Sequence, residues 1–166
     1  MESGNSGTSK TLGFICIDLE TTGLISPGAP LPRVLCAATM RLTRVDDAPG
    51  RFSTESARTW PAALDQPPES RPPQPMTLEQ LLELSDYLWE CCADTGFRLL
   101  AWNGVGYDYR LLWLIFGEGG SNERFRTACA RIKQLALESV DPMLTFTFAR
   151  GFPISLQAAA GVMPIA

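Results

Sequence analysis

The sequence GFICIDLETTGL, residues 13–24, decides the expected fold. Apolar residues fill its first half, as in a strand at the centre of a sheet. Asp18 and Glu20 follow two residues apart, and Thr-Thr-Gly comes directly after them. Because side chains alternate across a strand, both carboxylates are expected to project from the same face where the strand ends.

Two explanations are open for this pair of acids. Asp18 and Glu20 mark the place where the strand reaches water, or they hold a divalent cation, since two carboxylates on one face cost free energy unless a cation lies between them. Hard oxygen ligands of this kind select Mg²⁺ or Mn²⁺. A bare Asp-x-Glu favours the first explanation because so short a motif often arises by chance. The attached Thr-Thr-Gly favours the second.

A second acidic feature lies in LLAWNGVGYDYRLL, residues 99–112. A strand pattern leads into Asn103 and Gly104, where the glycines allow a tight turn, and Asp108 comes at the start of an apolar helix. A carboxylate at this position stabilises the helix start through the helix dipole. Asp108 is also placed to become a third metal ligand beside the first two acids, and both roles are compatible.

The order of elements predicts a single α/β domain. We expect strands at residues 12–17, 33–42 and 98–102, and helices at 77–94, 107–116 and 122–138, hence one sheet flanked by helices. Residues 1–11 form a polar tail, and residues 12–166 form the domain. A Pro-rich insertion at about residues 45–76 interrupts it, with at most a short strand around residues 51–53.

The predicted helices carry their own start signals. Thr77 and Gln80 have the spacing of a capping box. In the helix at residues 122–138, the face expected to be buried consists of Phe125, Cys129, Ile132 and Ala136. Four cations flank that face, and they either extend along the edge of the packed stripe or contact nucleic acid: Arg124, Arg126, Arg131 and Lys133.

Composition excludes several classes of protein. The chain of 166 residues has a formal net charge of -4 and no histidine, so histidine metal ligands and histidine general bases are excluded. Its five cysteines have no metal-binding spacing. No secretory, transit or membrane-spanning segment is visible. We therefore expect a cytoplasmic or nuclear protein without a membrane partner. Residues 98–166 carry 7 basic and 5 acidic residues, so any contact with an anionic polymer is expected there.

DLETTGL and WNGVGYDYRLL together resemble the first and second motifs of the DEDD, or DnaQ-like, 3′-to-5′ exonucleases of the ribonuclease H-like superfamily. The tail VDPMLTFTFARGFPISLQAAAGV, residues 140–162, is similar to the Asp-plus-helix and SLxxhA segment (h for apolar) before that family's third motif. The resemblance implies a ribonuclease H-like mixed sheet flanked by helices. It also implies hydrolysis of phosphodiester bonds at the 3′ end of a nucleic acid.

The resemblance further implies a site with two metal ions, Mg²⁺ or Mn²⁺, and a single-stranded 3′ end as partner. One ion activates water and the other stabilises the leaving 3′ oxygen. Asp18, Glu20 and Asp108 correspond to three of the four carboxylates that hold these ions. The residues that correspond to substrate-binding positions are Thr21, Thr22, Leu24, Asn103 and Tyr107.

The family's third motif, a fourth carboxylate with a His or Tyr general base, has no counterpart here. No acidic residue follows Asp141, and Tyr109 is the last tyrosine. Asp141 precedes Pro142 and is expected to cap a helix rather than replace the missing ligand. A general base contributes about 10²- to 10⁴-fold to a rate. The sequence therefore predicts a C-terminally truncated exonuclease fold with weak or undetectable activity.

Two other hypotheses remain. The same scaffold would serve as a non-catalytic module that binds nucleic acid or protein, with an oligonucleotide affinity that depends on salt and not on metal. Alternatively, this is an unrelated α/β domain whose acidic motifs are coincidental. That last hypothesis requires Asp108 to lie far from Asp18 and Glu20 in the folded chain.

Overall fold

The computed structural model describes residues 13–45, 50–60 and 74–162. The predicted polar tail at residues 1–11 lies outside the described residues. Two parts of the predicted insertion, residues 46–49 and 61–73, lie outside them as well.

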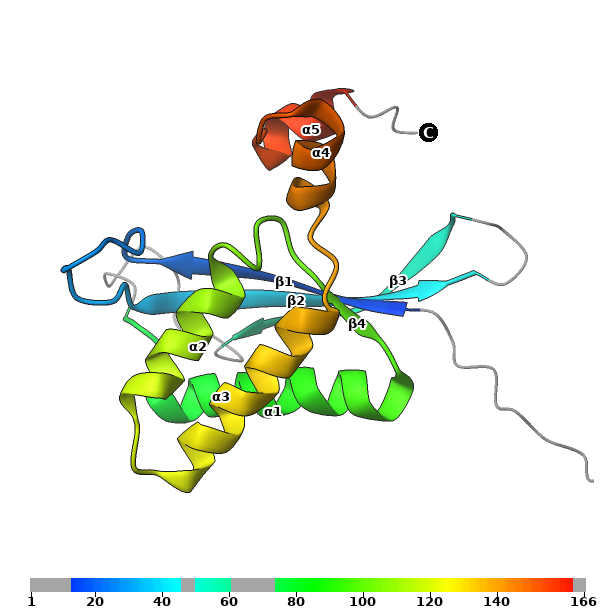
Figure 1. Ribbon diagram of the computed structural model, residues 1–166. Coiled ribbons are helices and arrows are strands. Elements are labelled where there is room, and N and C mark those ends of the chain that lie inside the picture. The colour runs from blue at the N-terminus through cyan, green and yellow to red at the C-terminus, as the bar shows by residue number, and fades with distance from the viewer. Residues whose placement is uncertain (1–12, 46–49, 61–73, 163–166) are drawn as a thin grey trace, which may run out of the picture.

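A mixed sheet of four strands forms the middle of the molecule (Figure 1). The strands are β1 (Gly13–Thr21), β2 (Val34–Arg44), β3 (Phe52–Trp60) and β4 (Arg98–Leu100), in the order β3-β2-β1-β4. β2 pairs antiparallel with both β1 and β3, and β4 pairs parallel with β1. Beyond β4, Val140 makes one further parallel bridge to Leu100. β1 is therefore a central strand, as its apolar sequence predicts.

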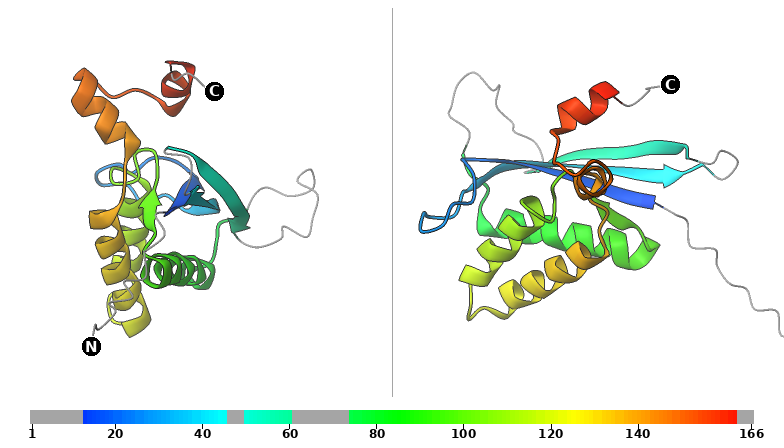
Figure 2. Two further views of the ribbon diagram at one scale, coloured as in Figure 1. Left: turned by 90° about the vertical axis from the view of Figure 1, so that its right-hand side faces the viewer. Right: turned by 45° about the horizontal axis from the view of Figure 1, so that its top comes forward.

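Helices lie on both sides of this sheet (Figures 1 and 2). On one side are α1 (Leu78–Thr95), α2 (Asp108–Glu118) and α3 (Glu123–Glu138). On the other side are α4 (Pro142–Arg150) and α5 (Leu156–Val162). The prediction of an α/β domain with one mixed sheet flanked by helices is confirmed.

The core lies between the sheet and the first three helices. Ile15, Ile17 and Leu19 of β1 are buried in one cluster with apolar side chains of the helices, among them Leu84, Leu88, Leu111, Leu112 and Ile132. The alternating side chains of β1 are half-buried or exposed, and Asp18 and Glu20 are among the exposed ones. Because the odd-numbered side chains of β1 are buried against the helices, the alternation of the strand places both acids on the face of the sheet away from α1, α2 and α3.

Local start signals are confirmed where the sequence predicts them. Thr77 and Gln80 form a complete capping box at α1. The side chain of Asn122 accepts a hydrogen bond from the backbone N–H of Arg124 at α3, and that of Asp141 accepts one from Met143 at α4. Such caps depend on neighbours in sequence, and this is why they are predictable.

Three expectations are corrected by the structure. β1 continues to Thr21, so Asp18 and Glu20 lie within the strand and not after it. Residues 52–60 form a full edge strand paired with β2, not the short strand expected at 51–53. In α3 the expected face is only part of the covered one: Ile132 is fully buried and Phe125, Cys129 and Ala136 are partly buried against the core, while Ala128 and Leu135 are fully buried as well. In α3, contacts with α1 and α2 decide which face is covered.

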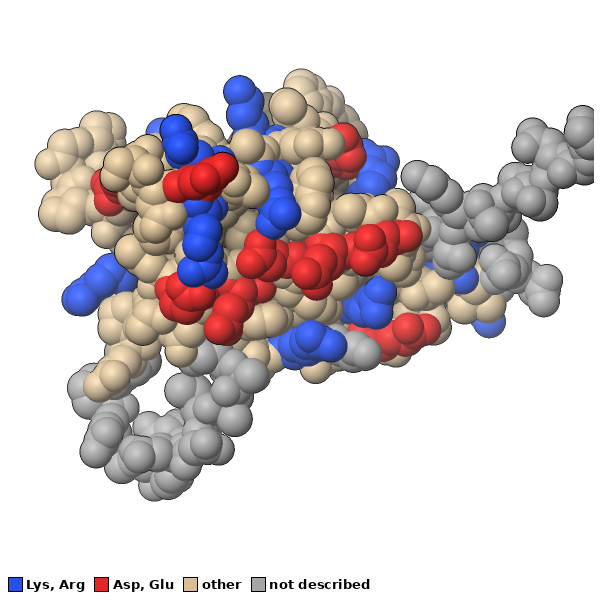
Figure 3. Space-filling model, turned by 90° about the horizontal axis from the view of Figure 1, so that it is seen from below, with Lys and Arg blue, Asp and Glu red and all other residues tan. Residues whose placement is uncertain are grey.

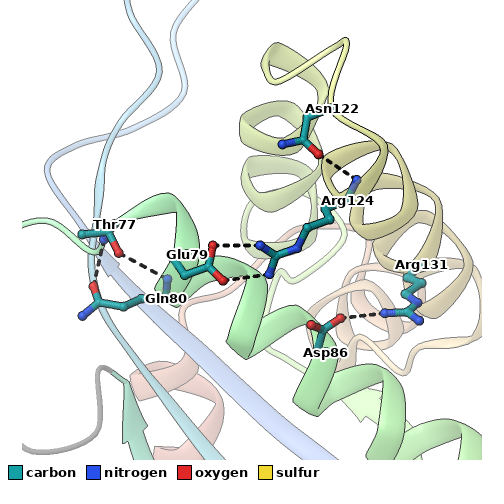
Figure 4. A network of polar contacts seen from close by, with 7 residues as sticks. All are labelled: Thr77, Glu79, Gln80, Asp86, Asn122, Arg124 and Arg131. Carbon is teal, nitrogen blue, oxygen red and sulfur yellow. Dashed lines mark hydrogen bonds and ion pairs between the residues drawn. The ribbon is translucent and has the colours of Figure 1, made fainter.

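Two of the four flanking cations of α3 connect it to α1 (Figure 4). Arg124 pairs with Glu79 at 2.7 Å and Arg131 pairs with Asp86 at 2.6 Å. The packing explanation therefore holds for Arg124 and Arg131. Within residues 13–45, 50–60 and 74–162, no helix has both the length and the apolar character needed to cross a membrane.

Candidate functional site

Asp18 and Glu20 lie side by side on the open face of β1. In the register with β2, Asp18 is opposite Ala38 and Glu20 is opposite Cys36, and the pairing becomes irregular directly after Glu20. Burial raises the pKa of the Cys36 thiol, and the charges of Glu20 and Asp18 raise it further. Both carboxylates therefore act on the same point of the neighbouring strand.

Asp108 reaches this end of β1 from a distant part of the sequence. Its carboxylate oxygen Oδ1 accepts a hydrogen bond from the backbone N–H of Leu19 at 3.1 Å, across a sequence separation of 89 residues. The Asp108 side chain is buried, with 5% of its surface exposed. The second acidic motif is thus attached to the peptide between the two acids of the first.

The Asp108 carboxyl has an unusual protonation behaviour. Burial raises its pKa to about 7, and the negative charge of Asp18 raises it too, against the lowering effect of the N–H of Leu19. A carboxylate in this position is stabilised by a proton or by a cation. A shift of this kind beside a second acid is typical of functional sites, although structural clusters produce it as well.

The donor set suits a hard divalent cation, but the side chains do not form a ready metal cluster. Carboxylate oxygens are the ligands that Mg²⁺ and Mn²⁺ prefer. Within the described part of the chain, no group of three or more Asp, Glu or Cys side chains is arranged to hold a metal ion.

The Thr-Thr-Gly segment is held against the start of α2. The hydroxyl oxygens of Thr21 and Tyr107 lie 2.6 Å apart, and both contact the carbonyl oxygen of Gly23. The next residue, Thr22, exchanges hydrogen bonds with the backbone of Arg33. These contacts give Thr21, Thr22 and Tyr107 a role in positioning the segment.

Leu24 differs from its neighbours because 78% of its surface is exposed. The hydrogen bonds of Thr21 and Thr22 hold the segment up to Gly23, and Leu24 follows it with its side chain in water. Of the residues expected to contact substrate, Leu24 is therefore the one with a freely accessible apolar surface.

Asn103 shapes the turn that leads to Asp108. It adopts a left-handed backbone conformation with φ of 61°, and its carbonyl oxygen accepts the N–H of Tyr107 at 2.8 Å. Its side-chain Oδ1 lies over Gly106, where a Cβ would collide with it. The structure therefore gives Asn103 a part in the turn, and no contact with Asp18 or Glu20.

Asp141 has a second role besides the helix cap that the sequence predicts. Besides capping α4, its oxygens accept the backbone N–H of Asn103 at 3.0 Å and of Val105 at 3.2 Å. The side chain is 7% exposed. The Asp-Pro pair signals the cap, whereas the bonds to the turn span 36 to 38 residues and have no local signal.

Asp18 also borders a cavity of about 600 Å³ on the face of the sheet opposite α1, α2 and α3. Most of the lining is apolar and includes Cys16, Met40, Leu100, Trp102 and Leu156. The volume is within the range of pockets that enclose small organic ligands. The site thus combines a carboxylate pair, a buried third acid and an adjoining apolar hollow.

The sequence matches no protein-family model, and no curated protein matches it.

Proposed function

We propose that this protein is a DEDD-type, ribonuclease H-like exonuclease in fold, which binds the 3′ end of a single-stranded nucleic acid with divalent metal and hydrolyses it slowly. One observation carries this proposal: the hydrogen bond from Leu19 to Asp108, which joins the two acidic motifs at the end of β1. Coincidental motifs would have no reason to meet at that peptide.

The carboxylates of Asp18, Glu20 and Asp108 would hold the ion or ions. Bound metal would supply a nucleophilic water and stabilise the leaving oxygen. The raised pKa of Asp108 supports this assignment, because a nearby cation would offset the burial and the negative charges of Asp18 and Asp141 that disfavour its ionisation. The central place of β1 in a mixed sheet also agrees with the resemblance.

The remaining residues would place the terminal nucleotide. Leu24 would lie under the last base with its exposed side chain. Thr21, Thr22 and Tyr107 would keep the segment around Gly23 in place through the hydrogen bonds described above. Asn103 would act through the turn before Asp108.

Slow hydrolysis is proposed for these 166 residues because they contain no counterpart of the family's third motif. Residues 142–166 contain no acidic residue, tyrosine or histidine, and so offer neither a fourth carboxylate nor a general base. Loss of the base alone accounts for about a 10²- to 10⁴-fold lower rate. Binding of a 3′ end should be retained better than turnover.

The test is metal-dependent binding and shortening of a 5′-labelled single strand. We expect Mn²⁺ to strengthen binding, and shortening to be slow or undetectable; Asp108→Asn should remove the effect of Mn²⁺ on both. Glu83→Gln, an exposed carboxylate of α1, is the matched control and should behave like the wild type. Binding by the wild type that Mn²⁺ does not strengthen contradicts the metal site. Rapid shortening that Asp18→Ala abolishes contradicts the impaired activity.

A further inference from the structure

A shallow groove lies between α2 and α3, on the part of the surface that follows the Asn103 turn. Its volume is about 230 Å³. We call it the α2–α3 groove and define it by Val105, Arg110, Trp113, Lys133 and Leu137. The three apolar members are exposed to an unusual degree, with 44% of Val105, 43% of Trp113 and 80% of Leu137 accessible. Exposed apolar side chains gathered in one groove indicate a binding surface.

The charge of the groove is opposite to that of the whole chain. Arg110 and Lys133 are exposed, and no acidic residue is among those that line it. Within the described part of the chain, neither Arg110 nor Lys133 forms an ion pair, whereas Arg124 and Arg131 pair with acids of α1. With a net charge of -4 for the chain, a cationic groove selects an anionic partner.

Acidic side chains gather elsewhere on the molecule. Figure 3, which views the face where α1 lies, shows them in a row, and α1 exposes Glu83, Glu90 and Asp94. A flexible anionic polymer would be repelled from that face. The α2–α3 groove, in contrast, combines two exposed cations with a lining that contains no acidic residue.

The spacing of the groove residues fits a polymer that has flat rings as well as charges. Arg110 and Trp113 are three residues apart on α2, which places them on one face of the helix. Lys133 and Leu137 are four residues apart on α3 and face the same groove. An accessible indole in one groove with two cations is the combination that stacks a base and neutralises the adjoining phosphates.

The groove is continuous with the turn of the proposed active site. Val105, at one end of it, donates its backbone N–H to Asp141 and lies three residues before Asp108. Val105 therefore belongs both to the groove and to the turn that leads to Asp108.

We propose that the α2–α3 groove binds single-stranded nucleic acid, with a base stacked on Trp113 and phosphates contacted by Arg110 and Lys133. This inference extends the proposed function, yet it does not require metal or the three carboxylates. An acidic amphipathic peptide would satisfy the charges as well, but it would leave the aromatic face and the continuity with the site without a role.

The test is the affinity of the full chain for a fluorescent oligothymidylate of about 12 nucleotides, a length within the usual site sizes. EDTA is present throughout, so that no divalent metal ion occupies the carboxylate site. We expect Trp113→Leu to weaken binding about tenfold. Arg110→Gln with Lys133→Gln should lower the slope of log affinity against log salt by about 1.4, or 0.7 for each lost phosphate contact. Arg44→Gln, an exposed cation on β2, is the control and should change neither quantity.

The opposite results overturn the proposal. Equal affinities of the wild type, Trp113→Leu and the variant with both Arg110→Gln and Lys133→Gln would show that the oligonucleotide binds elsewhere or not at all. Binding of an acidic amphipathic peptide with no binding of oligothymidylate would assign the groove to a protein partner. Asp18→Asn with Asp108→Asn separates the two proposals: in EDTA it should bind oligothymidylate as the wild type does, even if the wild type proves unable to bind Mn²⁺.

Discussion

At the scale of single residues, Asp108 combines two conflicting properties. Its hydrogen bond to Leu19 fixes it at the end of β1, while burial and the charge of Asp18 oppose its ionisation. A buried acid without a compensating cation lowers the stability of the fold at neutral pH. Such a cost is expected at a site that awaits a positively charged ligand.

This conflict predicts an unusual dependence of stability on pH. The unfolded carboxyl ionises near its ordinary pKa of about 4, whereas the folded one has a pKa of about 7. Between these values the folded chain holds a proton that the unfolded chain lacks, so the stability of the wild type should fall as the pH rises from 5 to 8. We expect a loss on the order of 2 kcal/mol. The chain has no histidine that would titrate in this range.

Urea unfolding at pH 5 and pH 8 measures the effect. Asp108→Asn keeps an acceptor for Leu19 and has no charge, so its stability should change little between the two pH values. Saturating Mn²⁺ should reduce the loss in the wild type at pH 8. A wild type and a variant with the same pH dependence would show that Asp108 is not the group responsible.

Asp141 gives a second prediction at this scale. Oδ1 accepts the N–H of both Asn103 and Met143, and Oδ2 accepts that of Val105. Asp141→Asn can keep the first oxygen and hence the cap of α4, but it places an NH₂ group against the N–H of Val105. We expect a cost of about 1 to 2 kcal/mol in urea unfolding, and faster amide exchange at residues 103–105. Asp141→Ala loses all three bonds and should cost more; equal losses in the two variants would mean that the bonds of Oδ1, including the cap of α4, contribute nothing measurable.

At the scale of elements, the turn between β4 and α2 decides where Asp108 lies. A Cβ on Gly104 would be 2.7 Å from both the Cβ of Ala101 and the ring of Tyr109. Tyr109 is a buried core residue that has little room to move. The turn is therefore tight because the helix packs against its own entry loop.

Gly104→Ala should consequently destabilise the chain by about 1 to 3 kcal/mol. Gly117 is the matched control, since it lies in α2 with nothing within 4 Å of an added Cβ. Gly117→Ala should leave stability unchanged or raise it by up to about 1 kcal/mol. Thermal unfolding of both variants tests this, and a harmless Gly104→Ala would show that the entry loop adapts freely.

Sequence reasoning succeeded for elements whose signals are local. The capping box at Thr77 and the apolar run of β1 needed no knowledge of the rest of the chain. It missed most of β3, because this exposed edge strand is stabilised by pairing with β2 rather than by an apolar pattern of its own. The covered face of α3 was predicted in part: its four expected residues pack against the core, but the full burial of Ala128 and Leu135 was missed, since contacts with α1 and α2 decide which side chains are buried most deeply.

At the scale of the whole molecule, the same distinction holds for the site. The motifs predicted that Asp108 would come close to Asp18, and the hydrogen bond to Leu19 brings it there. The bonds of Asp141 to the Asn103 turn, and the contact between Tyr107 and Thr21, join segments more than thirty-five residues apart. Sequence patterns do not contain such long-range contacts, because they arise only when the sheet and α4 assemble.

Charge also acts at this scale. Arg124 and Arg131 of α3 form ion pairs with acids of α1. Arg110 and Lys133 line the α2–α3 groove and remain accessible. An acidic protein can thus present a cationic surface beside a site for an anionic polymer.

Calorimetric titration of the protein with Mn²⁺, at a pH near 8 where Asp108 is ionised, tests whether the two acidic motifs form one metal site. Measurable binding is expected for the wild type, lost in both Asp18→Ala and Asp108→Ala and retained in Glu83→Gln. That result would show that acids from two distant motifs hold the same ion. Absence of binding in the wild type, or binding that survives Asp108→Ala, would show that they do not.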